Sequence, residues 1–92
     1  MERTYTVVLM SEATGGYSVF VPALPGCYSQ GETMAEAVAM ARESIELFLA
    51  MLEDDGDPLP PDNPQVTLDM SSTSKAVVRH VKVMVTEGSR VA

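Results

Sequence analysis

The apolar pattern of the chain changes its period once, near residue 33, and this change most restricts what the chain can fold into. From Met34 to Leu52, apolar residues recur at alternating spacings of four and three, which places them on one face of a helix. Thr33 lies directly before this pattern and Glu36 lies in its first turn. This is the spacing of a capping box, in which the two side chains satisfy backbone N–H groups at a helix start. We therefore expect one helix that begins near residue 34 and ends near Glu53.

Strand-like segments lie on both sides of this helix. Residues 4–10 (TYTVVLM) and 17–21 (YSVFV) are rich in β-branched and aromatic side chains, and a glycine-containing turn joins them as a hairpin. Residues 27–30 (CYSQ) predict a short third strand. Residues 76–86 (AVVRHVKVMVT) alternate and give the strongest strand pattern of the chain.

The order β-β-β-α-β indicates an α+β fold. We expect an antiparallel three-stranded meander with one helix packed on one face of the sheet. We also expect the final strand to lie parallel to the first, because a helix that joins two strands of one sheet favours a parallel, right-handed crossover. The opposite face of the sheet has no helix in this chain to cover it.

Length and charge limit the classes of function. A chain of 92 residues predicts a single domain, residues 1–92, with a proline-rich acidic loop at 54–75 and a tail at 87–92. Thirteen acidic residues against six basic ones give a net charge of −7, which opposes nucleic-acid binding and favours a basic protein partner. The N-terminus lacks a signal-peptide pattern and no apolar run is long enough to span a membrane, so we expect a cytoplasmic protein.

The residues that could carry catalysis or bind a metal are few. Cys27 would need a base to become a nucleophile, and the single histidine, His80, lies mid-strand and far along the chain. One cysteine and one histidine do not make a metal site, and the acidic run near Asp54 and Asp55 lacks the spacing of a calcium loop. We expect no catalytic residue, no cofactor and no metal.

A second stripe on the predicted helix suggests a contact surface. Met40, Leu47 and Met51 lie roughly opposite the core stripe, beside Glu43, where polar residues are usual. Adaptable methionine-bearing patches often contact partners, although single exposed apolar residues are also common. The predicted partner or oligomer contacts are Met40, Glu43, Leu47, Met51, Asp54, Asp55, His80 and Lys82.

The segment between the hairpin and the helix carries a recognisable set of turn residues. Residues 15–49 read GGYSVFVPALPGCYSQGETMAEAVAMARESIELFL and resemble the HicB-like antitoxin family, with a match over about residues 5–59 and the final strand. The resemblance makes this bend architectural rather than catalytic. The residues expected to shape it are Gly15, Gly16, Tyr17, Pro22, Pro25, Gly26, Cys27, Gly31, Thr33 and Glu36.

The resemblance also implies a function. It implies a partial ribonuclease-H-like fold and a type II antitoxin that covers a small basic HicA-type ribonuclease, in a dimer or larger homo-oligomer. About six residues follow the last predicted strand, so we expect no C-terminal DNA-binding segment. Two alternatives stay open: a homo-oligomeric relative without a toxin, and a degenerate metal-dependent nuclease, although residues 4–10 contain no carboxylate.

Overall fold

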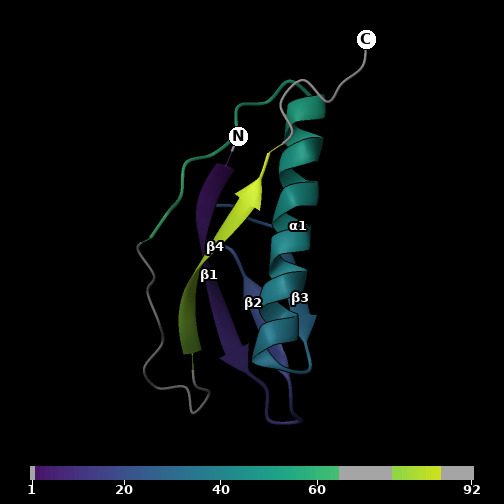
Figure 1. The fold of residues 1–92 in the computed structure, drawn as a ribbon, viewed down its shortest axis with the longest axis vertical. Coiled ribbons are helices and arrows are strands. Elements are labelled where there is room, and N and C mark those ends of the chain that lie inside the picture. Colours follow the sequence, from purple (N-terminus) through teal and green to yellow (C-terminus); the bar gives the residue numbers. More distant parts are fainter. Residues whose placement is uncertain (1, 65–75, 86–92) are drawn as a thin grey trace.

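The computed structural model of the chain describes residues 2–64 and 76–85. Its elements follow the predicted order, with a helix against one face of a four-stranded sheet (Figure 1). They are β1 (Glu2–Ser11), β2 (Tyr17–Phe20), β3 (Tyr28–Gly31), α1 (Met34–Asp54) and β4 (Ala76–Met84). The α+β class and the β-β-β-α-β order are confirmed, whereas the predicted tail at 87–92 lies outside the described residues.

The sheet has the strand order β3-β2-β1-β4, and all of its neighbouring strands are antiparallel. β2 pairs with residues 8–11 of β1, and β3 pairs along the whole of β2. The predicted meander is therefore present. At the turn between β1 and β2, Gly15 and Gly16 have φ values of 99° and 81°, a region that glycine adopts without the Cβ clash of other residues.

The predicted direction of the last strand is wrong. β4 runs antiparallel to β1, with Met84 opposite Glu2 and Ala76 opposite Met10. The prediction applied the crossover rule, in which the helix runs opposite to the two strands that it joins and so returns the chain to the end where the first of them began. Instead α1 and β4 run in the same direction, and residues after α1 lead back along β1 before β4 begins (Figure 1).

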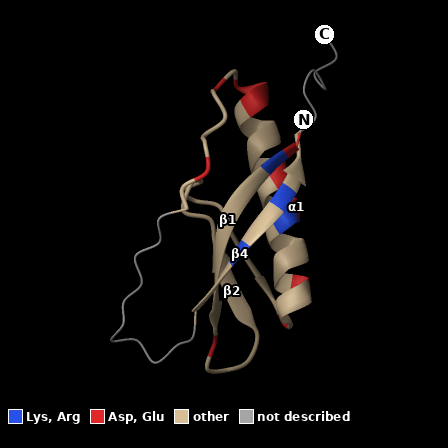
Figure 2. Ribbon diagram, turned by 60° about the vertical axis from the view of Figure 1, so that its left-hand side comes forward, with Lys and Arg blue, Asp and Glu red and all other residues tan. Residues whose placement is uncertain are grey.

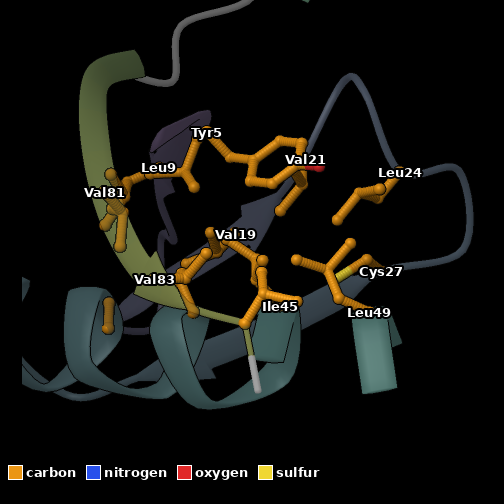
Figure 3. Close-up of a cluster of buried hydrophobic side chains, with 14 residues drawn as sticks. Tyr5, Leu9, Val19, Val21, Leu24, Cys27, Ile45, Leu49, Val81 and Val83 are labelled. Carbon is orange, nitrogen blue, oxygen red and sulfur yellow. The ribbon is translucent and has the colours of Figure 1, made fainter. Parts of the chain in front are cut away.

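The core lies between the sheet and the inner face of α1. Side chains that alternate along β1, β2 and β4 meet those of the helix, as Figure 3 shows. Leu24, from the bend after β2, is fully buried among them. The main buried side chains drawn there are Tyr5, Leu9, Val19, Val21, Leu24, Cys27, Ile45, Leu49, Val81 and Val83.

The bend between β2 and β3 consists of two successive turns. The Leu24 N–H donates to the Val21 carbonyl at 3.0 Å, and the Cys27 N–H donates to the Leu24 carbonyl at 2.9 Å. Gly26 has a φ of 91°, which a side chain would strain. Together with Pro22 and Pro25, which fix the local φ, these turns aim Leu24 into the core. The bend is thus built from hydrogen-bonded turns that place one side chain in the core.

The start of α1 is fixed by a capping arrangement close to a capping box, in which the glutamate accepts from the residue before the N-cap. The Thr33 hydroxyl accepts from the Glu36 N–H at 3.1 Å, and the Glu36 carboxylate accepts from the Glu32 N–H at 3.2 Å. Just before it, Gly31 lies so close to the helix that a Cβ there would collide with the backbone of Ala37. Gly31 therefore sets how closely the first turn of α1 approaches β3.

Replacing Gly31 should test this close contact. Because the neighbouring atoms belong to backbone, Gly31→Ala should lower the free energy of unfolding by about 1–3 kcal/mol, as overpacking usually does. Gln30→Ala, at an exposed position on the same strand, is the matched control and should change it by less than about 0.5 kcal/mol. Urea unfolding measures both. Equal effects of the two substitutions would contradict the role given to Gly31.

Candidate partner-binding surface

The outer face of α1 carries a stripe of exposed apolar side chains. Met40, Leu47 and Met51 are 41%, 64% and 59% exposed, although the opposite face of the same helix is buried against the sheet. These three lie seven and four residues apart, so they follow one line along the helix. The structure therefore places them together on one surface, as their spacing predicted. We call Met40, Leu47 and Met51 the helix stripe.

Acidic side chains flank the helix stripe, and no basic side chain lies at the C-terminal end of the helix. Glu43 is exposed on the turn between Met40 and Leu47, and Asp54 and Asp55 are exposed at the helix C-terminus. The last turn of α1 contains no basic residue, so the negative end of the helix dipole adds to these charges. Figure 2 shows acidic segments at both ends of α1. The surface therefore combines apolar contact area with negative potential.

An open hollow continues this surface at the N-terminal end of α1. It has a volume of about 440 Å³ and lies between the helix and the turn that joins β1 to β2. Three glutamates, Tyr17 and Met40 contribute to its lining; the glutamates are Glu12, Glu32 and Glu36. Met40 belongs to both the hollow and the helix stripe, so the two form one surface. Carboxylates around such a space suit a long basic side chain, since Arg and Lys carry only donors.

His80 and Lys82 lie on a different surface from the helix stripe. In the register of the sheet, His80 is opposite Thr6 and Lys82 is opposite Thr4, on the face that points away from α1. The structure thus divides the predicted contact residues into two groups. Met40, Glu43, Leu47, Met51, Asp54 and Asp55 belong to the helix side, and His80 and Lys82 belong to the outer sheet face.

An aspartate, a threonine and a histidine are joined by hydrogen bonds on the outer face. Sequence reasoning missed this arrangement. The Asp62 carboxylate accepts from the Thr6 N–H at 2.7 Å and from the Thr6 hydroxyl at 2.8 Å. Since that hydroxyl donates its only proton to Asp62, it accepts from His80 Nδ1 at 3.3 Å. Thr6 is fully buried and Asp62 contacts the threonine rather than the histidine, so this chain of bonds has no accessible nucleophile. We interpret it as structural.

Asp62 belongs to a segment that runs beside β1 where β2 does not. β2 pairs only with residues 8–11 of β1, and the carbonyl of Pro60 accepts from the side chains of Arg3 and Tyr5. Leu59 packs against the core just before this point. We call residues 57–62 the strap. Its sequence signalled only a proline-rich loop, because nothing local marks Asp62 as the partner of a strand 56 residues away.

Side chains of α1 also reach the outer edge of β4. Arg42 Nε donates to the Lys82 carbonyl at 3.0 Å, and the Met84 N–H donates to Glu46 Oε2 at 2.8 Å. Arg42 and Glu46 are four residues apart, so they project side by side from the helix. That spacing was the only sequence signal for this contact, and by itself it is also typical of a solvated helix face.

Cys27 is part of the core. Its side chain is 4% exposed and packs in the cluster between sheet and helix, whereas His80 lies on the other face of the sheet. Burial raises the pKa of the Cys27 thiol above its ordinary value of 9.0, so the thiol is protonated at neutral pH. A protonated, buried thiol without a histidine is inert as a nucleophile. These properties of Cys27 favour a structural over a catalytic interpretation of the bend.

Within residues 2–64 and 76–85, no three histidine, cysteine or acidic side chains are placed to share a metal ion. In the same residues, no helix has both the length and the apolar character needed to cross a lipid bilayer.

Known proteins share this sequence pattern and this fold. Residues 5–86 match the family described as HicB_like antitoxin of bacterial toxin-antitoxin system. A UPF0150 protein of Synechocystis is 46% identical over 56 residues, which cover 61% of this chain and 71% of that protein. A toxin-antitoxin complex from Streptococcus pneumoniae contains a chain with a TM-score of 0.78 and 23% identity, covering 100% of this chain and 78% of that one.

A second solved structure extends the likeness of fold. A chain of a HicA3 and HicB3 toxin-antitoxin complex has a TM-score of 0.66 and 22% identity, with 88% of this chain and 98% of that chain covered. At these identities, the two structures establish the shared fold. The match of residues 5–86 to the family carries the relationship in sequence.

Removing the carboxylate of Asp62 should loosen the strap. Asp62→Ala leaves the buried Thr6 N–H and hydroxyl without this partner, which should lower the free energy of unfolding by about 1–3 kcal/mol. Asp57→Ala is the control, because it removes an exposed carboxylate from the same segment. Urea unfolding gives the energies, and amide exchange at Thr6 should accelerate only in Asp62→Ala. Unchanged exchange at Thr6 would show that the strap is held by other contacts.

Proposed function

The chain belongs to the HicB-like antitoxin family of bacterial toxin–antitoxin systems, and from this premise we propose that it sequesters and inhibits a small basic HicA-type ribonuclease. In this proposal the chain is a binding protein and not an enzyme, acts in the cytoplasm, and contacts its toxin through the helix stripe and the acidic hollow. It also associates with further copies of itself.

The observation that carries the proposal is the outer face of α1. A helix of a small acidic protein exposes Met40, Leu47 and Met51 in one line and places Glu43 among them. Covering each such apolar side chain is worth about 1.5–3 kcal/mol at full burial, so this stripe offers a partner substantial binding energy. The carboxylates around it add specificity and a faster approach for a basic partner rather than large affinity.

The charge of the whole chain supports the same partner. A net charge of −7 attracts a basic protein and repels an RNA backbone, so the chain can compete for the basic surface that such a ribonuclease offers to RNA. The two structures with the same fold are both named as toxin–antitoxin complexes, which makes a toxin the natural partner to test. The acidic hollow is the place where we expect a long basic side chain of the toxin.

The first test is capture of the partner followed by inhibition of its activity. The tagged chain should recover a small basic protein from its host in near-equal amount, and high salt should weaken the capture because the contact is partly ionic. The recovered protein should cleave RNA, and the added chain should stop that cleavage. A basic ribonuclease that the chain binds but does not inhibit would overturn the proposal, as would the absence of any ribonuclease partner.

A single substitution should test whether the helix stripe contributes to inhibition of the toxin. Leu47→Lys puts a positive charge at a 64% exposed position. The lysine should repel a basic toxin, and the loss of the leucine removes apolar contact area. We expect inhibition to weaken by roughly tenfold or more, which corresponds to about 1.4 kcal/mol. Thr4→Lys adds the same charge at an exposed position on the other face of the sheet and serves as the control.

Titration of ribonuclease activity measures both variants, and thermal unfolding verifies that they fold. Equal inhibition by Leu47→Lys and the unchanged chain would place the toxin contact elsewhere, while leaving the antitoxin proposal itself to the capture experiment.

A further inference from the structure

The two edges of the sheet differ in whether their backbone groups already have partners. β4 forms one edge and β3 forms the other (Figure 1). At the open side of β4, Arg42 donates to the Lys82 carbonyl. On the same side, Glu46 accepts from the Met84 N–H. Native proteins cover sheet edges in such ways against added strands, so β4 is a protected edge.

The direction of the backbone groups in the sheet can be followed from β1. Thr6 donates its N–H to Asp62 rather than to β4, so the backbone groups of Thr6 point toward the β2 side. Directions alternate along an antiparallel strand, and therefore the groups of Val8, two residues further on, also point to β2. Val8 lies opposite Phe20, so these two residues exchange backbone hydrogen bonds. The even-numbered residues of β2 thus bond to β1, and the odd-numbered ones face β3.

The same alternation leaves the outer side of β3 open. Val19 of β2 lies opposite Ser29 and bonds to it. Tyr28 and Gln30, on either side of Ser29, therefore direct their N–H and C=O groups away from the sheet. Within residues 2–64 and 76–85, no hydrogen bond takes up these groups. Both residues are exposed, Tyr28 by 70%, so β3 is an unprotected edge.

The acidic hollow begins at the end of this open edge. Gln30 and Gly31 of β3 line it, and the carboxylates of Glu12, Glu32 and Glu36 surround it. A strand added beside β3 would therefore pass the hollow with one of its side chains. Arg and Lys have the length and the donors to reach these carboxylates. Such a bond would also fix the register of the added strand.

Charge selects a basic partner over a second copy of the chain at this edge. Residues 4–41, which include the whole of β3, contain no Lys or Arg. A second copy paired through β3 would therefore bring no cation to the hollow, and its net charge of −7 would oppose contact at this acidic end. A basic protein brings both the cation and a charge of the opposite sign.

We propose that a strand of the basic toxin adds to the sheet along β3 and places an Arg or Lys side chain in the acidic hollow. The inference rests on the proposed function, since it states how the proposed toxin is held. Backbone bonds to Tyr28 and Gln30 give the attachment, and the pocket for one side chain gives the choice of partner, as strand addition usually works. Met40 joins the hollow to the helix stripe, so one partner covers both.

The test uses two synthetic peptides and therefore does not depend on finding the toxin. One peptide of about eight residues, an ordinary strand length, alternates valine with arginine, and its control alternates valine with glutamate. Amide exchange of the full chain, followed by NMR, should slow at Tyr28 and Gln30 with the arginine peptide only. A flexible peptide loses conformational freedom on binding, so we expect a dissociation constant of roughly 1 mM.

Variants of the chain locate the contact. Gln30→Pro removes an outward N–H that the ladder to β2 does not use, a change that edge strands tolerate. It should weaken peptide binding by roughly tenfold or more, whereas Gln30→Ala keeps the N–H and should weaken it by less than about twofold. Glu12→Gln combined with Glu32→Gln removes two exposed carboxylates and should weaken binding by roughly fivefold. Thermal unfolding verifies each fold, and the double glutamine variant keeps the test decisive if Gln30→Pro unfolds.

Each outcome bears on the proposal. Protection at Tyr28 and Gln30 that requires arginine in the peptide and falls in the variants would support it. Equal protection by the glutamate peptide, protection only at β4 or the helix stripe, or no protection by either peptide would overturn it. Slow exchange at both residues that grows with the concentration of the chain alone would also overturn it, because a second copy would then occupy the edge.

Inhibition of the captured ribonuclease separates this result from the proposed function. A chain that stops its toxin while Tyr28 and Gln30 still exchange freely in the complex contradicts the strand addition alone. A chain that binds the arginine peptide along β3 but inhibits no ribonuclease contradicts the proposed function alone.

Discussion

The close approach of α1 to β3 at Gly31 is the contact on which the other features of the structure depend. Because the backbone of Ala37 leaves no space for a side chain at residue 31, the helix lies directly on the sheet from its first turn. Small residues at Ala37 and Ala41 continue this approach, and Ile45 and Leu49 then fill the wider space toward the other end. With the inner face of α1 fixed in this way, its outer face has to present Met40, Leu47 and Met51 to solvent.

The helix side and the outer sheet face differ because charged side chains are distributed differently over the helix and the strands. Charged residues that cannot enter the core are placed on the solvent side of α1 and in the turns, where water and backbone N–H groups stabilise them. The strands instead direct threonine, valine and aromatic side chains to their second face. The acidic protein therefore has a helix side that repels other acidic molecules and a sheet face that does not.

Local patterns predicted the features that local interactions determine. The capping box of Thr33 and Glu36, the 3-4 spacing of α1 and the hairpin before it could all be identified from neighbouring residues, and so could the exposure of the helix stripe. The direction of β4 could not, because it depends on the strap returning the chain along β1. Nor could the bonds from Asp62 to Thr6, or from Arg42 to Lys82, since each joins residues at least 40 positions apart. The partner contacts themselves remain predictions.

The position of β1 between β4 and the strap has a consequence for how the chain is made. Among the described elements β1 is synthesised first, yet its neighbours include residues 57–62 and β4, which are synthesised only after α1. A nascent chain that ends after α1 can form the meander but leaves the N-terminal half of β1 without either neighbour. Long sequence separation of this kind slows folding, because loop closure precedes the stabilising contact. The strand that is synthesised before the other described elements is thus the last to gain all of its neighbours.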